Sequence, residues 1–189
     1  MFEPFSLRRS PKPTWKYRLS FLLSWTLALN YGCVGQMPKA LSIASGSMEP
    51  TLEVEDRIYM TPATYNDRSP QRGDIVTFTP PPTMAEINPV WSDDIIILSR
   101  VVGLPGETFE VREGQTLIDQ VPLQEPYVKA PAAYTLEPVV IPEDAYVVLG
   151  DNRNNAFDSI AWGFLPEKNI TGKVQIIYWP PGRFGSVYD

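Results

Sequence analysis

The sequence contains no histidine and only one cysteine, Cys33, among its 189 residues. Without histidine the chain cannot build a Ser-His-Asp triad, a Cys-His pair or a His-ligated metal site. A single cysteine excludes both an intramolecular disulfide and a thiolate zinc site, so cysteine usage indicates no redox compartment. The sequence implies neither a metal nor an organic cofactor, and any catalysis must use other side chains.

Basic residues are outnumbered, since 16 Lys and Arg stand against 22 Asp and Glu and give a formal net charge of −6. A general nucleic-acid binder needs a basic face, so we expect no nucleic-acid partner. Proline is abundant, with 20 residues, about twice the average usage. Because proline breaks helices and central strands, while 43% of the residues are hydrophobic, we expect a packed core of short strands and ordered loops.

The N-terminus concentrates the basic residues, because residues 1–18 contain five of them and one acid, Glu3. An apolar run over 19–29 follows and continues more weakly to 36. By the positive-inside rule we predict 1–18 as a basic cytoplasmic tail and 19–36 as a single membrane anchor. Residues 37–189 would then form a β domain on the trans side, in a periplasm, a lumen or the extracellular space, with the lipid bilayer as a partner.

The apolar run is short for a membrane span, since roughly 20 residues are needed to cross about 30 Å of hydrocarbon. A cleaved signal peptide and a buried amphipathic helix are therefore alternatives. Segment 31–36 offers only a poor small-residue cleavage pattern, which favours a retained anchor.

Beyond residue 40 the pattern changes to short β-rich runs separated by turn residues. No long amphipathic helix and no repeat is evident. We expect a mainly β fold of antiparallel, strongly bent sheets, with the proline-rich stretches 79–83 and 129–133 as surface loops. The predicted strands cover 56–60, 74–78, 94–102, 108–112, 145–149 and 173–179.

Without histidine, a hydrolase can use a serine activated by a buried neutral lysine, a carboxylate pair or an acid-bound metal. Segment 43–52 is a candidate serine site, because Gly46 lets a substrate approach Ser47 and Pro50 stiffens the following turn. Segment 150–159 is rich in Asn and Asp. Its acids do not follow EF-hand spacing, which favours a self-hydrogen-bonded turn over a calcium loop.

Four segments then occur in order, and together they resemble the sequence boxes of the type I signal peptidase (leader peptidase) family. The resemblance covers roughly residues 40–180 and is greatest to the compact bacterial, cyanobacterial and plastid members. It implies a signal-peptidase-like β domain over 37–189. The four segments are Ser-Gly-Ser-Met-Glu-Pro-Thr-Leu over 45–52, Arg-Gly-Asp-Ile-Val over 72–76, Arg-Val-Val-Gly-Leu-Pro-Gly-Glu over 100–107, and Gly-Asp-Asn-Arg-Asn-Asn with Asp-Ser and Trp-Gly over 150–163.

This resemblance implies a membrane-bound serine endopeptidase that acts on signal peptides of exported preproteins. Ser47 would be the nucleophile, and its backbone N–H and the Ser45 hydroxyl would form the oxyanion hole. The substrate would lie as an added strand beside shallow apolar pockets that admit small side chains. The residues implied for these pockets are Ile43, Ala44, Met48, Ile96, Ile97 and Leu98.

The sequence departs from the family pattern at the position of the general base, where Ser99 stands in place of a lysine. Arg100 cannot replace that lysine, because a guanidinium stays protonated. The serine that would orient the lysine is replaced by Ala156, and Ile160 replaces a usual arginine. Lys129 is the first candidate for a substitute base.

The remaining charged residues of these segments are expected to be structural. We expect Asp151 and Asp158 to form ion pairs with Arg100 and Arg153.

Two functions therefore stay open. The chain is either a signal peptidase that cleaves with Ser47 and another base, or a non-catalytic homologue. Such a homologue would bind signal peptides, or an active signal peptidase, and modulate processing. A purely structural β domain is a weaker third interpretation, because the pocket-lining sequence is retained.

Overall fold

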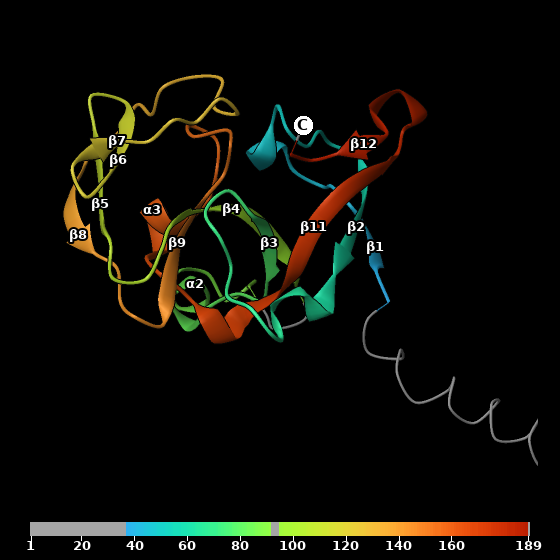
Figure 1. Cartoon of the computed structure of the whole chain (residues 1–189), viewed down its shortest axis with the longest axis horizontal. Helices are drawn as coiled ribbons and strands as arrows, with labels where there is room; N and C mark the ends of the chain where they lie inside the picture. Colours follow the sequence, from blue (N-terminus) through green and yellow to red (C-terminus); the bar gives the residue numbers. More distant parts are fainter. Residues whose placement is uncertain (1–36, 92–94, 189) are drawn as a thin grey trace, which may run out of the picture. The chain divides into compact units, whose positions relative to one another are not determined.

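The computed structural model of the chain describes residues 37–91 and 95–188 (Figure 1). Within these residues neither helix has the length and apolar character needed to cross a bilayer. The predicted basic tail over 1–18 and the predicted anchor over 19–36 lie outside the described residues.

The larger of two sheets has eight strands, and each of its strand pairs is antiparallel. Its register is broken by bulges where β11 pairs with β2 and β3, which bend the sheet. Along the sheet the order is β1 (Lys39–Ser42), β2 (Arg57–Thr61), β11 (Ile170–Trp179), β3 (Ile75–Phe78), β4 (Ile97–Gly103), β9 (Ala145–Leu149) and β10 (Leu165–Pro166), with β12 (Gly185–Ser186) paired to β11.

The smaller sheet has four antiparallel strands and lies to the left of β9 in Figure 1. Its order is β7 (Val121–Pro122), β6 (Gln115–Ile118), β5 (Thr108–Arg112) and β8 (Leu136–Val140). The helical elements are all short: α2 (Pro82–Ile87), α3 (Ser159–Trp162) and the 3₁₀ turns η1 (Gly46–Met48), η2 (Pro62–Tyr65), η3 (Glu167–Asn169) and η4 (Pro181–Arg183).

Burial patterns explain these strands. In β2 the side chains alternate, with Ile58 and Met60 buried and Arg57 exposed, as expected for a strand with one face on the core. The four residues of β3 are all buried, because this strand lies in the middle of the larger sheet. The prediction of a mainly β, antiparallel and strongly curled fold is confirmed.

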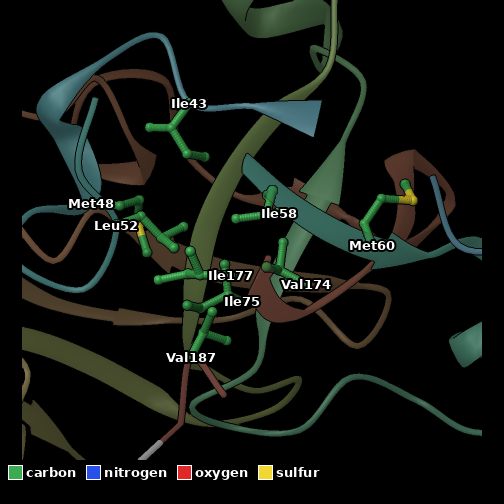
Figure 2. Close-up of a cluster of buried hydrophobic side chains, with 9 residues drawn as sticks. All are labelled: Ile43, Met48, Leu52, Ile58, Met60, Ile75, Val174, Ile177 and Val187. Atoms are coloured by element: carbon green, nitrogen blue, oxygen red, sulfur yellow. The ribbon is translucent and has the colours of Figure 1, made fainter. Parts of the chain in front are cut away.

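Three hydrophobic clusters fill the interior. The first lies between β2, β3 and β11, and Figure 2 shows Met48 and Leu52 pointing into it. Both side chains have an exposed fraction of 0%. Full burial of such a side chain contributes about 1.5–3 kcal/mol to folding, so this cluster fixes the turn η1 on the sheet.

Some local predictions were wrong. Segment 79–83 was predicted as a loop, but α2 begins within it at Pro82, since proline fits the first helical turn. The strands β1, β6, β7, β8, β10 and β12 were not predicted. Strand β8 contains Pro138, which it accommodates at the edge of the smaller sheet.

Candidate functional site

Ser47 lies in the 3₁₀ turn η1, between β1 and β2. The Oγ atoms of Ser45 and Ser47 are 3.2 Å apart, within hydrogen-bond distance. Met48, the next residue, is the side chain that anchors the turn in the core. Exposed Ser45 and half-buried Ser47 thus present two hydroxyls on a turn that is fixed by buried Met48.

The segment 150–159 holds this turn from the other side. The backbone N–H of Asn152 donates to the Ser47 carbonyl at 3.0 Å, and its side-chain amide donates to the Gly46 carbonyl at 3.0 Å. Gly150 is required at this contact, because a Cβ there would lie 2.5 Å from both the backbone carbonyl oxygen of Ser47 and the Cβ of Ala156. Two segments far apart in the sequence are therefore locked together at Ser47.

A cleft of about 530 Å³ opens in front of these hydroxyls. It brings together four residues predicted for the catalytic site and two predicted for the peptide pockets. It also contains aromatic and amide side chains that were not predicted. The lining residues are Ser45, Gly46, Ser47, Trp91, Ile97, Leu98, Ser99, Asn154, Asn155, Ala156 and Phe157.

The other predicted pocket residues lie elsewhere. Ile43 and Met48, with exposed fractions of 5% and 0%, belong to the first core cluster and face the interior. Neither side chain is among the residues that line the cleft, so their role as pocket lining stays a prediction. Ala44 and Ile96 are exposed, but neither lines the cleft.

Ser99 lies in β4 opposite Val76 and is 4% exposed. Its hydroxyl donates to the Leu98 carbonyl at 2.8 Å. Among the described residues that line the cleft, none carries an amine, an imidazole or a carboxylate. The described lining can therefore donate hydrogen bonds and offer apolar contact, but its side chains include no ordinary general base for Ser47.

Lys129 lines a different cleft, of about 580 Å³, on the side of Glu49, Glu53 and Asp151. Lys173 forms an ion pair with Asp74, with 2.5 Å between Nζ and Oδ1. Neither lysine lines the cleft of Ser47.

Arg100 and Asp151 form a buried, two-point ion pair. Arg100 Nε and Nη2 lie 2.8 and 2.7 Å from the two Asp151 oxygens, and the side chains are 5% and 0% exposed. Thr51 donates to Asp151 at 2.5 Å, and the guanidinium lies 4.0 Å from the centre of the Tyr127 ring. Burial, and after it the neighbouring Glu125, raises the pKa of Tyr127, so its phenol stays neutral.

The expected pair between Asp158 and Arg153 is replaced by other contacts. Arg153 pairs with Glu125 instead, with 2.5 Å between Nη2 and Oε1. Asp158 caps α3 by accepting from the Ile160 N–H at 3.1 Å, and it also accepts from the Gly150 N–H at 3.0 Å. The cause is geometric, since Asp158 directs its oxygens at backbone donors. Burial raises the pKa of its carboxyl, although the backbone hydrogen bonds and Arg153 oppose the shift.

The residues of the site that were not singled out from the sequence are Asn152, which binds η1, and four that line the cleft: Trp91, Asn154, Asn155 and Phe157. Asn152 lies within the segment that is predicted to form a turn, but nothing local indicates that it binds η1. Phe157 interrupts a run of polar residues, and Trp91 stands in a proline-containing loop. An isolated aromatic residue in a polar loop is a usable signal for a binding surface.

Comparisons with known proteins identify the family. The family model described as "Signal peptidase, peptidase S26" matches residues 17–179, so the chain belongs to this family. The chain is 42% identical over 165 residues to a signal peptidase I of Leptolyngbya laminosa. The aligned residues cover 87% of this chain and 79% of the relative. It is 38% identical over 179 residues to a probable signal peptidase I-2 of Synechocystis sp., covering 95% and 80%.

Similarity extends to a plastid protein and to a solved structure. Thylakoidal processing peptidase 1 of Arabidopsis thaliana is 39% identical over 143 residues, covering 75% of this chain and 42% of the relative. A crystal structure of a signal peptidase I from Enterococcus faecalis is 28% identical, with a TM-score of 0.46, and covers 56% of this chain and 97% of that one.

Proposed function

We propose that this protein acts in the processing of exported preproteins, by binding the end of a signal peptide in the cleft of Ser47. The single observation that carries the proposal is the meeting of Ser45, Ser47 and two apolar residues of β4, Ile97 and Leu98, in one cleft of a signal peptidase family member. An extended peptide would lie along this cleft, with its apolar side chains against β4.

The membrane is part of the same proposal. Residues 19–36 would anchor the chain, with 1–18 in the cytoplasm and the β domain on the trans side. The substrate would then arrive in the same bilayer as the protein. The similarity to a thylakoidal processing peptidase supports a membrane location.

If the protein cleaves, Ser47 Oγ would attack the scissile carbonyl. The Ser47 backbone N–H and the Ser45 hydroxyl would then donate to the oxygen on which negative charge develops. The two hydroxyl oxygens are 3.2 Å apart, so both can contact the same scissile peptide group. Among the described residues that line the cleft, no side chain is an ordinary base that could remove the Ser47 hydroxyl proton.

A second candidate function is recognition without cleavage, either of signal peptides or of an active signal peptidase. It is favoured by Ser99 and Ala156, which occupy the positions of the base and its orienting serine. A serine hydroxyl is a poor nucleophile without a base. An oxyanion hole and substrate positioning alone retain roughly 10³–10⁴-fold over water when a catalytic member is missing, which is too little for routine processing.

Two assays on the full-length protein in detergent test recognition and cleavage separately. Fluorescence anisotropy with a labelled signal peptide measures binding, and incubation with a preprotein measures cleavage. Saturable binding supports the proposed recognition, and its absence contradicts it. Cleavage that Ser47→Ala abolishes assigns the peptidase function, whereas binding without cleavage assigns the second function.

A further inference from the structure

Two aromatic side chains of the cleft, Trp91 and Phe157, are stacked on each other. Their ring centres are 5.9 Å apart and their planes differ by 10°. Both rings line the cleft that contains Ser47, Ser99 and Ala156. They come from the loop after α2 and from segment 150–159, so the stack connects two separate parts of the chain across one wall of the cleft.

Phe157 is held on both sides. Its carbonyl accepts a hydrogen bond from the Trp162 indole N–H at 3.1 Å, and Trp162 is 4% exposed. The next residue, Asp158, is 2% exposed and caps α3. The Phe157 side chain nevertheless has an exposed fraction of 38%. The backbone is therefore fixed while part of the ring remains available for contact.

Trp91 is fixed in a comparable way. Its backbone N–H donates to the Asn88 carbonyl at 3.1 Å, and the Asn88 N–H donates to the Met84 carbonyl at 3.0 Å. Met84 is 0% exposed, and the indole packs against the second core cluster. The stack therefore joins an indole that packs on the core to a ring whose backbone is hydrogen-bonded to buried Trp162.

The placement of Ile43 and Met48 in the core gives this wall its significance. With those two side chains turned inward, the bulky side chains on the cleft side of Ser47 are Trp91, Phe157 and the β4 residues Ile97 and Leu98. A rigid aromatic wall limits the volume beside a bound peptide, because packed rings do not yield to an added methylene group without strain.

We propose that the Trp91–Phe157 stack sets the size of the peptide side chain that the cleft accepts. The inference rests on the proposed binding of signal peptides and assigns specificity to two residues that take no part in bond cleavage. Peptides with small residues just before the cleavage site would fit beside the rings, whereas branched side chains would collide with them.

The test compares the affinities of two labelled peptides for the full-length protein in detergent. One peptide has Ala at the first and third positions before the cleavage site, and the other has Leu at both. We expect the unmodified protein to bind the Ala peptide at least about tenfold more tightly, because pocket discrimination of aliphatic size is commonly about 10–200-fold. In Phe157→Ala and in Trp91→Ala the ratio should fall to about twofold or less.

The matched controls are Phe184→Ala and Trp179→Ala, which remove exposed aromatic side chains outside the cleft (69% and 49% exposed) and should leave the ratio unchanged. Phe157→Tyr keeps the ring and should retain discrimination even if Phe157→Ala proves unstable to heating.

An unchanged ratio in the folded Ala variants would overturn the assignment, as would equal binding of both peptides by the unmodified protein. A relaxed ratio in Phe157→Tyr would also contradict it. Failure of the unmodified protein to bind either peptide would instead contradict the proposed function, on which this inference depends.

Discussion

Ser99 and Arg100 are neighbours in β4, yet they belong to two very different environments. Ser99 lines the cleft of Ser47, whose described side chains are uncharged. Arg100 lines another cleft, of about 660 Å³, together with Arg72 and Asp74. One strand therefore separates a neutral surface from a charged one, because successive strand residues point to opposite faces.

The difference between the two sides of β4 shows which charged residues stabilise the fold. On the Arg100 side, the charged groups form ion pairs, and the pair of Arg100 with Asp151 is buried. Losing either group would leave an unpaired charge in the interior. On the other side, the Ser99 hydroxyl donates a hydrogen bond to the Leu98 carbonyl, and it forms no ion pair because it carries no charge. The structural charges and the Ser99 position are therefore separable.

The largest expected effect comes from placing an amine that can act as a base on the neutral side. The double substitution Ser99→Lys with Ala156→Ser should raise preprotein cleavage by about 10³-fold, since positioned acid–base catalysis contributes about 10²–10⁴-fold. The rate should rise with pH through the lysine pKa, because only the neutral amine accepts a proton and burial lowers that pKa. Single-turnover cleavage assays from pH 5 to 10 measure both effects.

In the same double variant, adding Ser47→Ala should return cleavage to background. A double variant that folds and binds peptide but remains inactive would show that these two substitutions do not suffice for cleavage in this cleft.

The next largest effect is expected on the charged side. Asp151→Ala leaves the Arg100 guanidinium buried without its carboxylate and should destabilise the fold by about 3–5 kcal/mol. The matched control is Glu53→Ala, because Glu53 is 53% exposed and pairs with Arg183 at 3.0 Å. Loss of such a surface pair costs about 0–1 kcal/mol. Urea unfolding of both variants measures the difference, and similar costs would refute the contrast.

A smaller effect is expected where segment 150–159 meets Ser47. Gly150→Ala introduces a Cβ that would lie 2.5 Å from the Ser47 oxygen, and we expect about 1–3 kcal/mol of destabilisation from overpacking. Gly182→Ala is the control, since its Cβ would meet nothing within 4 Å. The thermal unfolding temperature and the peptide affinity should both fall in Gly150→Ala and not in Gly182→Ala. Equal effects in the two variants would argue against a tight contact between Gly150 and Ser47.

The smallest effect is a pH dependence. Burial raises the pKa of Asp158 above its ordinary value of 3.8, so the folded protein holds this proton more tightly than the unfolded chain. The resulting stabilisation is fully present below pH 3.8 and is lost as pH rises through the folded pKa. The free energy of unfolding of the unmodified protein, minus that of Asp158→Asn, should therefore fall over this range. A rising difference would contradict the assigned direction.

Much of the fold was predictable because its strands carry local signals. The run from Ile75 to Phe78 is apolar throughout, and β2 alternates exposed and buried residues. Pro138 concealed β8 and Pro82 concealed α2, since proline ordinarily interrupts both kinds of element. Local sequence did not reveal that these prolines occupy an edge strand and a first helical turn, where they are tolerated.

The site was predictable in part for a different reason. The family resemblance brought Ser45, Ser47, Ser99 and Ala156 together, and the structure places all four around one cleft. It did not distinguish Met48, which faces the core, from its serine neighbours. The pairing of Arg153 with Glu125 and the stacking of Trp91 on Phe157 join distant segments, so they depend on the tertiary fold.

The two hydrogen bonds from Asn152 to the turn η1 have a dynamic consequence. Segments that share such bonds open as one cooperative unit when a protein fluctuates locally. The serine turn and the start of segment 150–159 should therefore become accessible to hydrogen exchange together rather than one after the other. Hydrogen bonds that link two segments of the chain would thus hold Ser47 in place.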